Sequence, residues 1–375
     1  SFFVMSAYPD LQACPEFLTI TQLDCLLSEA DVSPGGVYGV GGELPADDLI
    51  GVLEAHMPWE SAAAWSAFAI GDPVQSVADL VYTPGPPALL RQELWKRCAR
   101  VEQDQVTWES CDEAAQREIE LDIPRTMPKV LPESKQDSLR KVLRTVARNP
   151  KTRYCQSMSV LAAVLLMVNF SDADAVILLE NMLERYSQGW HTVSMSGFMP
   201  SVKVLEHLIA RFLPEVHTQL QRLEVPMVAL AFDPFLCFFA KEYPLSVVVR
   251  FWDVMLMEGP RAIYALVLAG LELHGEQLQS AEAIDASQQA VVMLHRAAAA
   301  GAVDSLDTHL ETARKWLRNP EVWTTLAVLQ SEVEDGTLPD AGAPPPPPGG
   351  WSLTGIGSSA LGGFSAVGGL VGAAA

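Results

Sequence analysis

The chain has 375 residues, 49% of them apolar, and carries a formal net charge of −21 at pH 7. This length allows one large domain with appendages or two domains, and the apolar fraction is sufficient for a substantial core. The negative charge argues against nucleic-acid binding, which depends on neutralising phosphates, and against electrostatic docking on anionic lipid.

The charge is unevenly distributed along the chain. Residues 1–90 contain twelve Asp and Glu but no Lys or Arg, and all 25 basic residues lie between Arg91 and Arg318. This change in composition indicates a domain boundary near residue 85. We therefore divide the chain into an acidic N-terminal segment of unknown function (1–83), a central domain (84–275), a helical extension (276–333) and a disordered Pro/Gly/Ala-rich tail (334–375).

The six cysteines are scattered, with no CxxC pair and no metal-ligand spacing. Reduced thiols in a cytosolic protein are the favoured interpretation. The N-terminus lacks the basic and long apolar regions of a signal peptide, so a cytoplasmic location is expected. Because the chain begins at Ser1 rather than Met, loss of a leader stays open as an alternative.

The acidic segment predicts helical pieces at Leu18–Glu29 and Trp59–Phe68, separated by Gly and Pro. Its Gly35–Gly42 run lacks the Lys-Ser/Thr and the GxGxxG register of nucleotide-binding loops, which favours a flexible turn. One hypothesis is that this segment folds back over a basic patch and restrains access to the domain. The patch is formed by Lys141, Arg144 and Arg148.

The central domain reads as helical throughout. Pro86-Pro87 precede an amphipathic first helix, and Ser134 with Asp137 resembles a capping box for a helix that stops at Asn149-Pro150. Val160–Val168 is apolar on every side, which predicts a central buried helix. Further helices are expected at 172–186, 201–212, 232–240, 247–257 and 263–273. No stretch alternates with the period of a strand, so the predicted fold class is all-α.

Beyond residue 276, helices at Gln288–Ala299 and Leu306–Leu317 are expected to pack on the end of the domain. Pro344–Pro348 favours a stiff polyproline II spacer and is a candidate ligand for an SH3 or WW domain. The uncharged segment Trp351–Ala375 is rich in Gly and lacks flanking Lys or Arg, which favours disorder over a membrane span.

Two short polar segments, Ile119–Pro128 and Arg153–Ser159, carry the chemistry. In the first, Arg125 lies between two prolines, which indicates a rigid loop. Such a loop could direct the planar, permanently charged guanidinium group toward a phosphate. Asp122, three residues earlier, could orient this guanidinium. The alternative interpretation is a surface arginine on a Pro-rich turn.

In the second segment, Gln156 comes just before the apolar helix. A helix N-terminus offers free N–H groups and a partial positive charge, which suit a phosphate or an attacking water. Tyr154 and Cys155 are expected to pack against neighbouring helices and to set the direction of Gln156. The alternative is a glutamine that serves only as an N-terminal helix residue.

Together the segments, IxxDxxRTxP followed by YCQ-x-M and an apolar helix, resemble the TBC domain of GTPase-activating proteins for Rab-type small GTPases. The segment Arg91–Lys96 resembles the first motif of that family, and Leu213–Gly259 is similar to its later core. The resemblance extends in order across most of Pro84–Leu273 and implies an all-α, multi-helix TBC fold. It does not cover residues 1–80 or the tail.

The resemblance implies that Arg125 is an arginine finger supplied in trans and that Gln156 is a second finger, which orients the hydrolytic water. Four neighbours would support these fingers or contact the GTPase: Asp122, Thr126, Tyr154 and Cys155. GTP and Mg²⁺ belong to the partner, so the chain would need no cofactor and would act as an activator rather than an enzyme. It would regulate vesicle trafficking and reach the surface of endomembranes through its GTPase partner.

Three positions depart from the family pattern. Ser157 stands where the family has Gly, and Ser159 where it has Asn. If that backbone needs a positive φ or a close approach to the partner, Ser157 would weaken docking or displace Gln156. Pro234 replaces a Trp and is expected to alter packing only. The rival interpretation is a catalytically inactive helical scaffold that binds a GTPase or adaptor and recruits others through its proline-rich tail.

Overall fold

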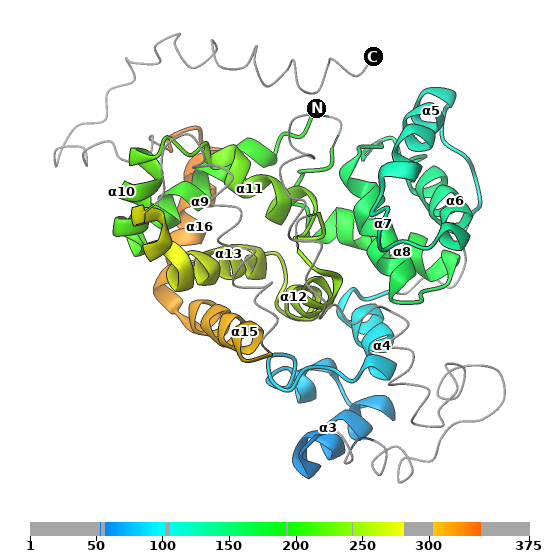
Figure 1. The fold of residues 1–375 in the computed structure, drawn as a ribbon, viewed down its shortest axis with the longest axis horizontal. Coiled ribbons are helices and arrows are strands. Elements are labelled where there is room, and N and C mark those ends of the chain that lie inside the picture. The colour runs from blue at the N-terminus through cyan, green and yellow to red at the C-terminus, as the bar shows by residue number, and fades with distance from the viewer. Residues whose placement is uncertain are drawn as a thin grey trace. The chain divides into compact units, whose positions relative to one another are not determined.

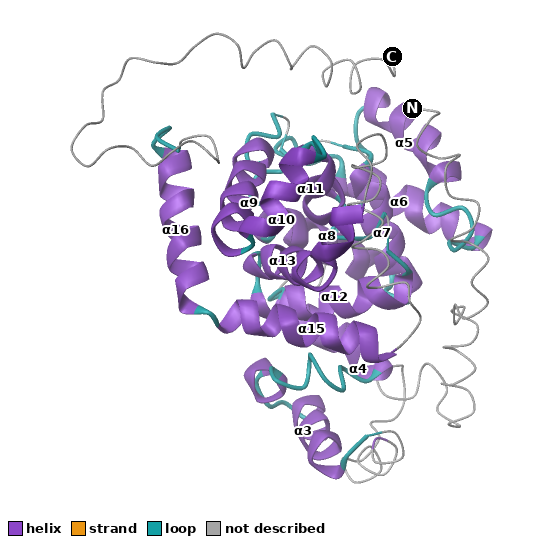
Figure 2. Ribbon diagram, turned by 60° about the vertical axis from the view of Figure 1, so that its left-hand side comes forward, coloured by secondary structure: helices purple, strands orange, loops and turns teal. Residues whose placement is uncertain are grey.

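The computed structural model describes residues 53, 57–101, 106–152, 154–192, 194–241, 243–280 and 303–338. Within these ranges every regular element is a helix, which confirms the all-α prediction (Figure 1, Figure 2). The first half contains α3 (Trp59–Ala69), η2 (Val74–Val77), α4 (Ala88–Cys98), α5 (Glu113–Asp122), η3 (Ile123–Arg125), η4 (Glu133–Lys135), α6 (Gln136–Val146), α7 (Ser157–Met167) and α8 (Asp172–Arg185). The second half contains α9 (Phe198–Phe212), α10 (Pro214–Arg222), α11 (Met227–Leu236), α12 (Leu245–Glu258), α13 (Arg261–His274), η5 (Gly275–Ser280), α15 (Val303–Arg318) and α16 (Pro320–Glu334).

The predicted buried helix is α7. Its residues from Leu161 to Met167 are all buried, and α6 and α8 pack against it. A helix that is apolar all round cannot face water on any side, so it takes the central position among these three helices. Because α6 also packs against η3, it links the start of α7 to the turn that carries Arg125.

A fully buried carboxylate joins the first motif of the domain to its later core. Asp253 on α12 accepts hydrogen bonds from Trp95 Nε1 at 2.7 Å, Arg91 Nε at 3.0 Å and Arg250 Nη1 at 3.4 Å. Burying a lone carboxylate is costly, and these three donors compensate for its lost hydration. The result ties α4 to α12 across about 160 residues of chain.

Residues 57–83 pack into the same core as the domain that follows them. Arg97 Nη1 donates to the Phe68 carbonyl at 2.8 Å, and Arg250 Nη2 donates to the Tyr82 carbonyl at 2.6 Å. Gly85 has φ +93°, and a Cβ there would lie 1.8 Å from Arg250 Nη1, so this position requires glycine. The boundary at residue 83 therefore marks a change in composition rather than a gap in packing, and it stays a prediction as a domain limit.

The C-terminal helices pack on the domain, as expected for the extension. Helix α15 lies along α13, and α16 packs against α9 (Figure 1). Arg314 on α15 donates through Nη2 to Asp79 Oδ1 at 2.6 Å, and Arg318 pairs with the same carboxylate. These ion pairs connect α15 to the segment that precedes α4.

Two details of the predicted helices are wrong. Helix α6 begins at Gln136 without a side-chain cap, because Ser134 lies in a preceding 3₁₀ turn and forms no capping box. The helix predicted to reach residue 240 ends at Leu236, where Phe238 and Phe239 take positive φ values of 45° and 66° and turn the chain. The buried Asp233 accepts from the Lys241 backbone N–H at 3.0 Å and closes this turn.

Several predictions lie outside the described residues. These are the helices at Leu18–Glu29 and Gln288–Ala299, the Gly35–Gly42 turn, the Pro344–Pro348 spacer and the tail Trp351–Ala375. Across the ranges that the structure does describe, no helix combines the length and the apolar character needed to cross a membrane.

Candidate functional site

Arg125 lies at the end of a 3₁₀ turn that continues directly from α5. Pro124 occupies the start of this turn, and the buried Thr126 closes it by donating from Oγ1 to the Asp122 carbonyl at 2.8 Å. Met127 then takes a positive φ of 44° and redirects the chain. The Arg125 side chain is 54% exposed, so a rigid backbone presents a charged group to solvent.

The two predicted segments meet at one carboxylate. Asp122 Oδ1 accepts from Arg125 Nη2 at 2.6 Å, and Asp122 Oδ2 accepts from the Tyr154 hydroxyl at 2.7 Å. Both Asp122 and Tyr154 are buried. Burial, followed by the nearby charge of Asp122, raises the pKa of Tyr154, so the phenol stays protonated and donates. The turn of Arg125 and the start of α7 are therefore fastened together.

Gln156 occupies the N-cap position of α7 and is exposed. Its carbonyl accepts from the Ser159 hydroxyl at 2.9 Å and from the Ser159 backbone N–H at 3.1 Å. Its side-chain amide forms no hydrogen bond with any residue in the described ranges. The backbone of Gln156 is thus held firmly while its amide stays available to a partner.

The two serines that depart from the family pattern fit the local structure. Ser157 is the first residue of α7 and does not take a positive φ, so the backbone makes no demand for glycine there. Its hydroxyl lies 3.0 Å from Cys155 Sγ. Burial raises the pKa of the half-buried Cys155 thiol, which argues against a nucleophilic role. Ser159 holds the Gln156 backbone through the two hydrogen bonds to its carbonyl.

The basic patch proposed as a target for the acidic segment is already paired within the domain. Arg144 Nη2 lies 3.0 Å from Glu120 Oε1, Lys141 Nζ lies 3.1 Å from Asp172 Oδ2, and Arg148 lies near two further acids. These pairs reduce the positive charge that the patch offers to another segment. No group of three or more His, Cys, Asp or Glu suited to a metal occurs among the described residues.

Comparison with known proteins identifies the fold and the family. Residues 87–279, just over half of the chain, match RabGAP-TBC, the Rab-GTPase-TBC domain. The chain belongs to the Rab-GTPase-TBC family. Proteins of this family are GTPase activators, which act on the hydrolysis of a partner and are not enzymes in their own right.

The chain is similar to curated TBC proteins over part of their length. It is 28% identical over 207 residues to growth hormone-regulated TBC protein 6 of Caenorhabditis elegans, covering 54% of this chain and 62% of the relative. It is 28% identical over 236 residues to human small G protein signaling modulator 3, covering 58% of this chain and 31% of the relative. The chain therefore spans less than two thirds of either relative.

A solved structure shows the same fold. The crystal structure of the Chlamydomonas flagellar RabGAP TBC domain superposes with a TM-score of 0.55, covering 75% of this chain and 98% of that chain. The sequence identity is 19%, so this likeness concerns the fold alone.

Proposed function

We propose that this TBC domain accelerates GTP hydrolysis by a Rab-type small GTPase in its GTP form, with Arg125 as an arginine finger and Gln156 as a glutamine finger. The observation that carries the proposal is the shared carboxylate of Asp122, which fastens both finger segments while Arg125 and Gln156 stay exposed. Two polar groups on rigid, connected mounts can enter a docked nucleotide site together.

Arg125 is suited to bind phosphate while it remains oriented. A guanidinium has five N–H donors, and the bond from Nη2 to Asp122 leaves Nε and Nη1 available. A cation supplied in trans offsets the charge that develops on the transferred phosphoryl group. Such a finger increases the hydrolysis rate by roughly 10³–10⁵, equivalent to about 4–7 kcal/mol of barrier.

Gln156 is suited to orient the attacking water. Its side-chain amide offers both an acceptor and donors, and it lies at the N-terminus of α7, which carries a partial positive charge. Serving this role from the activator would replace a glutamine of the GTPase. GTP and Mg²⁺ would arrive with the partner, so the proposal requires no cofactor in this chain.

This role would place the protein in the cytoplasm and, through its GTPase partner, at the surface of endomembranes, where it would regulate vesicle trafficking. Neither nucleic acid nor a membrane span has a part in the proposal.

Replacing Arg125 with Ala tests the proposal directly. GTP hydrolysis by a panel of purified Rab-type GTPases is measured with wild-type protein, Arg125→Ala and Lys129→Ala. Lys129 is exposed in the same loop, so its variant removes the same charge without removing the proposed finger. We expect Arg125→Ala to lose stimulation by a factor of about 10³ or more, because the variant removes the cation proposed to offset the phosphoryl charge.

Binding distinguishes loss of chemistry from loss of docking. Arg125→Ala should bind a GTPase loaded with a non-hydrolysable GTP analogue about as well as wild-type protein does, and Lys129→Ala should keep its stimulation. Undiminished stimulation by Arg125→Ala would reject the finger assignment. Binding without stimulation by the wild-type protein would favour the rival scaffold.

A further inference from the structure

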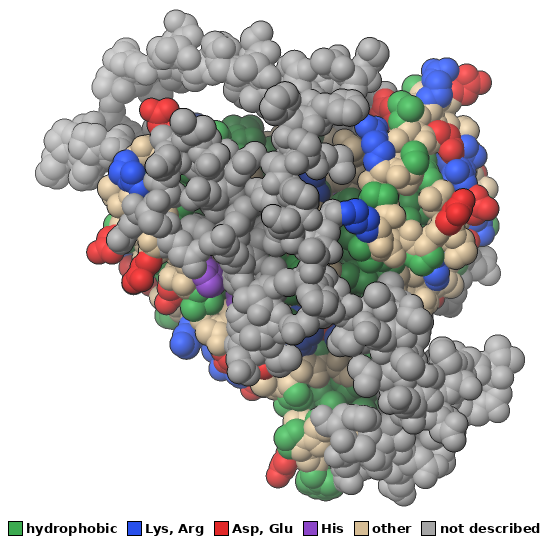
Figure 3. Space-filling model, in the orientation of Figure 1, with side chains coloured by type: hydrophobic (Ala, Val, Ile, Leu, Met, Phe, Trp, Pro, Cys, Tyr) green, Lys and Arg blue, Asp and Glu red, His purple; other side chains and the backbone are tan. Residues whose placement is uncertain are grey.

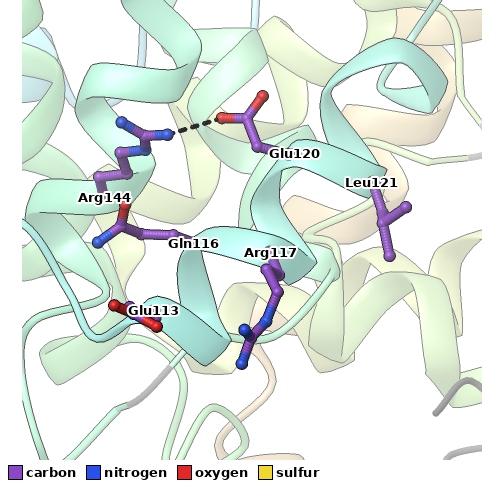
Figure 4. Close-up of a pocket in the computed structure, with 6 residues that line it drawn as sticks. All are labelled: Glu113, Gln116, Arg117, Glu120, Leu121 and Arg144. Atoms are coloured by element: carbon purple, nitrogen blue, oxygen red, sulfur yellow. Dashed lines mark hydrogen bonds and ion pairs between the residues drawn. The ribbon is translucent and has the colours of Figure 1, made fainter.

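A shallow groove of about 570 Å³ runs along α5, the helix that leads into the Arg125 turn. Figure 4 shows the side chains that line it. They come from α5 and α6: Glu113, Gln116, Arg117, Glu120, Leu121 and Arg144. The groove ends at Leu121, the residue before the shared carboxylate of Asp122.

One wall of the groove is already neutralised. Glu120 Oε1 accepts from Arg140 Nε at 2.7 Å and from Arg144 Nη2 at 3.0 Å. The hydrogen bond from Arg140 holds the pKa of Glu120 below its usual value, so this carboxylate stays charged and paired. Gln116 Nε2 donates to the Cys111 carbonyl at 2.8 Å. These bonds fix the positions of the side chains on this wall of the groove.

The other side is a stripe of exposed, uncommitted side chains, Glu113, Arg117 and Leu121. They recur every four residues, so they project from one face of α5 with a rise of about 6 Å between neighbours. Leu121 is 63% exposed although it is apolar. Arg117 has no hydrogen bond or ion pair with the described residues. Both side chains extend from α5 away from the Glu120–Arg144 pair (Figure 4).

We propose that Arg117 and Leu121 form a second contact surface for the GTPase and help to select which GTPase is activated. This inference rests on the proposed function. The partner GTPase would place an apolar side chain against Leu121 and a carboxylate opposite Arg117. Arg117 lies about one helical turn further from the nucleotide than Leu121 does.

Continuity with the finger site supports this occupant. A stable protein–protein contact covers about 800 Å² of each partner, far more than one exposed arginine provides. A GTPase whose nucleotide lies at Arg125 must therefore cover neighbouring surface, and Leu121 is one helical turn before Arg125 on the same continuous segment. An exposed leucine in this position can bury apolar surface only when a partner is docked.

The charge of the surface supports selection rather than general attraction. Acidic and basic side chains alternate over the face formed by α5 and α6, so the face has no single-sign field (Figure 3). With Glu120 and Arg144 paired to each other, Arg117 is the basic groove residue left to read a partner charge. A correctly placed carboxylate would be favoured there and a basic side chain would be repelled.

The test uses Leu121→Asp, the milder Leu121→Ala and Arg117→Glu, with Glu118→Lys as the control. Glu118 is exposed on α5 but does not line the groove. For each GTPase in the panel that wild-type protein stimulates, we measure kcat and KM of stimulated hydrolysis. We also measure Kd for the same GTPase loaded with a non-hydrolysable GTP analogue.

Leu121→Asp should raise KM and Kd about tenfold, which corresponds to about 1.4 kcal/mol, and should leave kcat unchanged. Leu121→Ala should change them in the same direction by a smaller factor. Arg117→Glu should raise KM several-fold for some GTPases and spare others, which would reorder the preference within the panel. Glu118→Lys should leave that order intact.

Unchanged KM and Kd for both the Leu121 and the Arg117 variants would overturn the inference, and so would a fall in kcat alone. A changed oligomeric state or increased stimulation would assign the groove to a second copy or to the acidic segment, which also overturns it. Retained stimulation by Arg125→Ala would reject the finger assignment but leave the binding result standing. If the wild-type protein neither stimulated nor bound any GTPase of the panel, both proposals would be overturned.

Discussion

Asp122→Asn is the substitution that most directly tests how the two proposed fingers are positioned. The wild-type carboxylate accepts one hydrogen bond on each oxygen, from Arg125 and from Tyr154. Asparagine has nearly the same shape but offers one acceptor and one donor group. Its oxygen can accept from Arg125 while its N–H₂ group donates to the Tyr154 hydroxyl, which can also act as an acceptor. The substitution therefore keeps the geometry but removes the negative charge that holds the Arg125 guanidinium.

The structure predicts different costs for the two ends. The Arg125 bond is half-exposed, so losing it should cost folding no more than about 1 kcal/mol. The Tyr154 hydroxyl is buried, and leaving it unpaired should cost about 1–3 kcal/mol. We expect the amide N–H₂ group to donate to the Tyr154 hydroxyl and the amide oxygen to accept from Arg125, since this orientation leaves neither neighbour unpaired. The bond to Arg125 is then neutral on the acceptor side and weaker, so the guanidinium is held less firmly while the fold survives.

The expected effect on activity is a loss of about 10–100-fold in stimulated kcat, because a displacement of about 1 Å in a catalytic group can cost 10²-fold. This loss should be smaller than that of Arg125→Ala, since the guanidinium is still present. Single-turnover GTP hydrolysis at saturating activator measures the loss. Urea unfolding of the same samples measures the free energy of unfolding.

Two variants complete the test. Tyr154→Phe keeps the Asp122–Arg125 pair and should lower stability by about 1 kcal/mol, with a smaller effect on kcat than Asp122→Asn. Glu118→Gln removes an exposed carboxylate from the same helix and should change neither quantity. If Asp122→Asn stimulated hydrolysis with the same kcat as the wild-type protein, the positioning role of this carboxylate would be refuted.

Two further predictions concern stability. His309 and His191 are buried and bond backbone carbonyls through Nε2, and burial lowers the pKa of each to about 4. Their neutral forms stabilise the fold fully above about pH 6.5, and this contribution should fall, by on the order of 3 kcal/mol for each histidine, as the pH drops toward 4. Urea unfolding at pH 7.5 and 5 should therefore show that the free energy of unfolding of His309→Gln depends less on pH than that of the wild-type protein. An identical pH dependence would contradict the assignment. Asp253→Ala would leave two half-buried arginines without their carboxylate partner and the buried Trp95 N–H without its acceptor, and should cost about 3–5 kcal/mol in the same assay. A loss below 1 kcal/mol would show that water replaces the carboxylate.

Local sequence patterns were sufficient to predict the helical class and the position of the central helix. The run from Val160 to Val168 has no polar face, so its burial follows from composition alone. The prolines beside Arg125 indicated a rigid loop rather than a helix interior, and the structure places Arg125 at the end of a short 3₁₀ helix that follows α5. Helix ends were less predictable. The end of α11 at Leu236 is followed by a turn that the buried Asp233 closes by accepting from the Lys241 N–H, eight residues further along the chain.

The sequence predicts one of the two contacts of Asp122. Its spacing from Arg125 indicated that it could orient the guanidinium, and that contact is present. The bond to Tyr154 joins positions 32 residues apart, and no local pattern specifies such a pair. It arises because α6 packs against both the Arg125 turn and α7.

The groove on α5 was also beyond local inference. The helical period places Arg117 and Leu121 on an outer face, but only the packing of α6 beside α5 makes that face a groove next to the finger turn. The motifs of the chain by themselves determined its family and led to the proposal that Arg125 and Gln156 are its fingers. Tertiary structure alone decided which side chains hold them and which neighbours stay free for a partner, because those properties depend on contacts between segments that are distant along the chain.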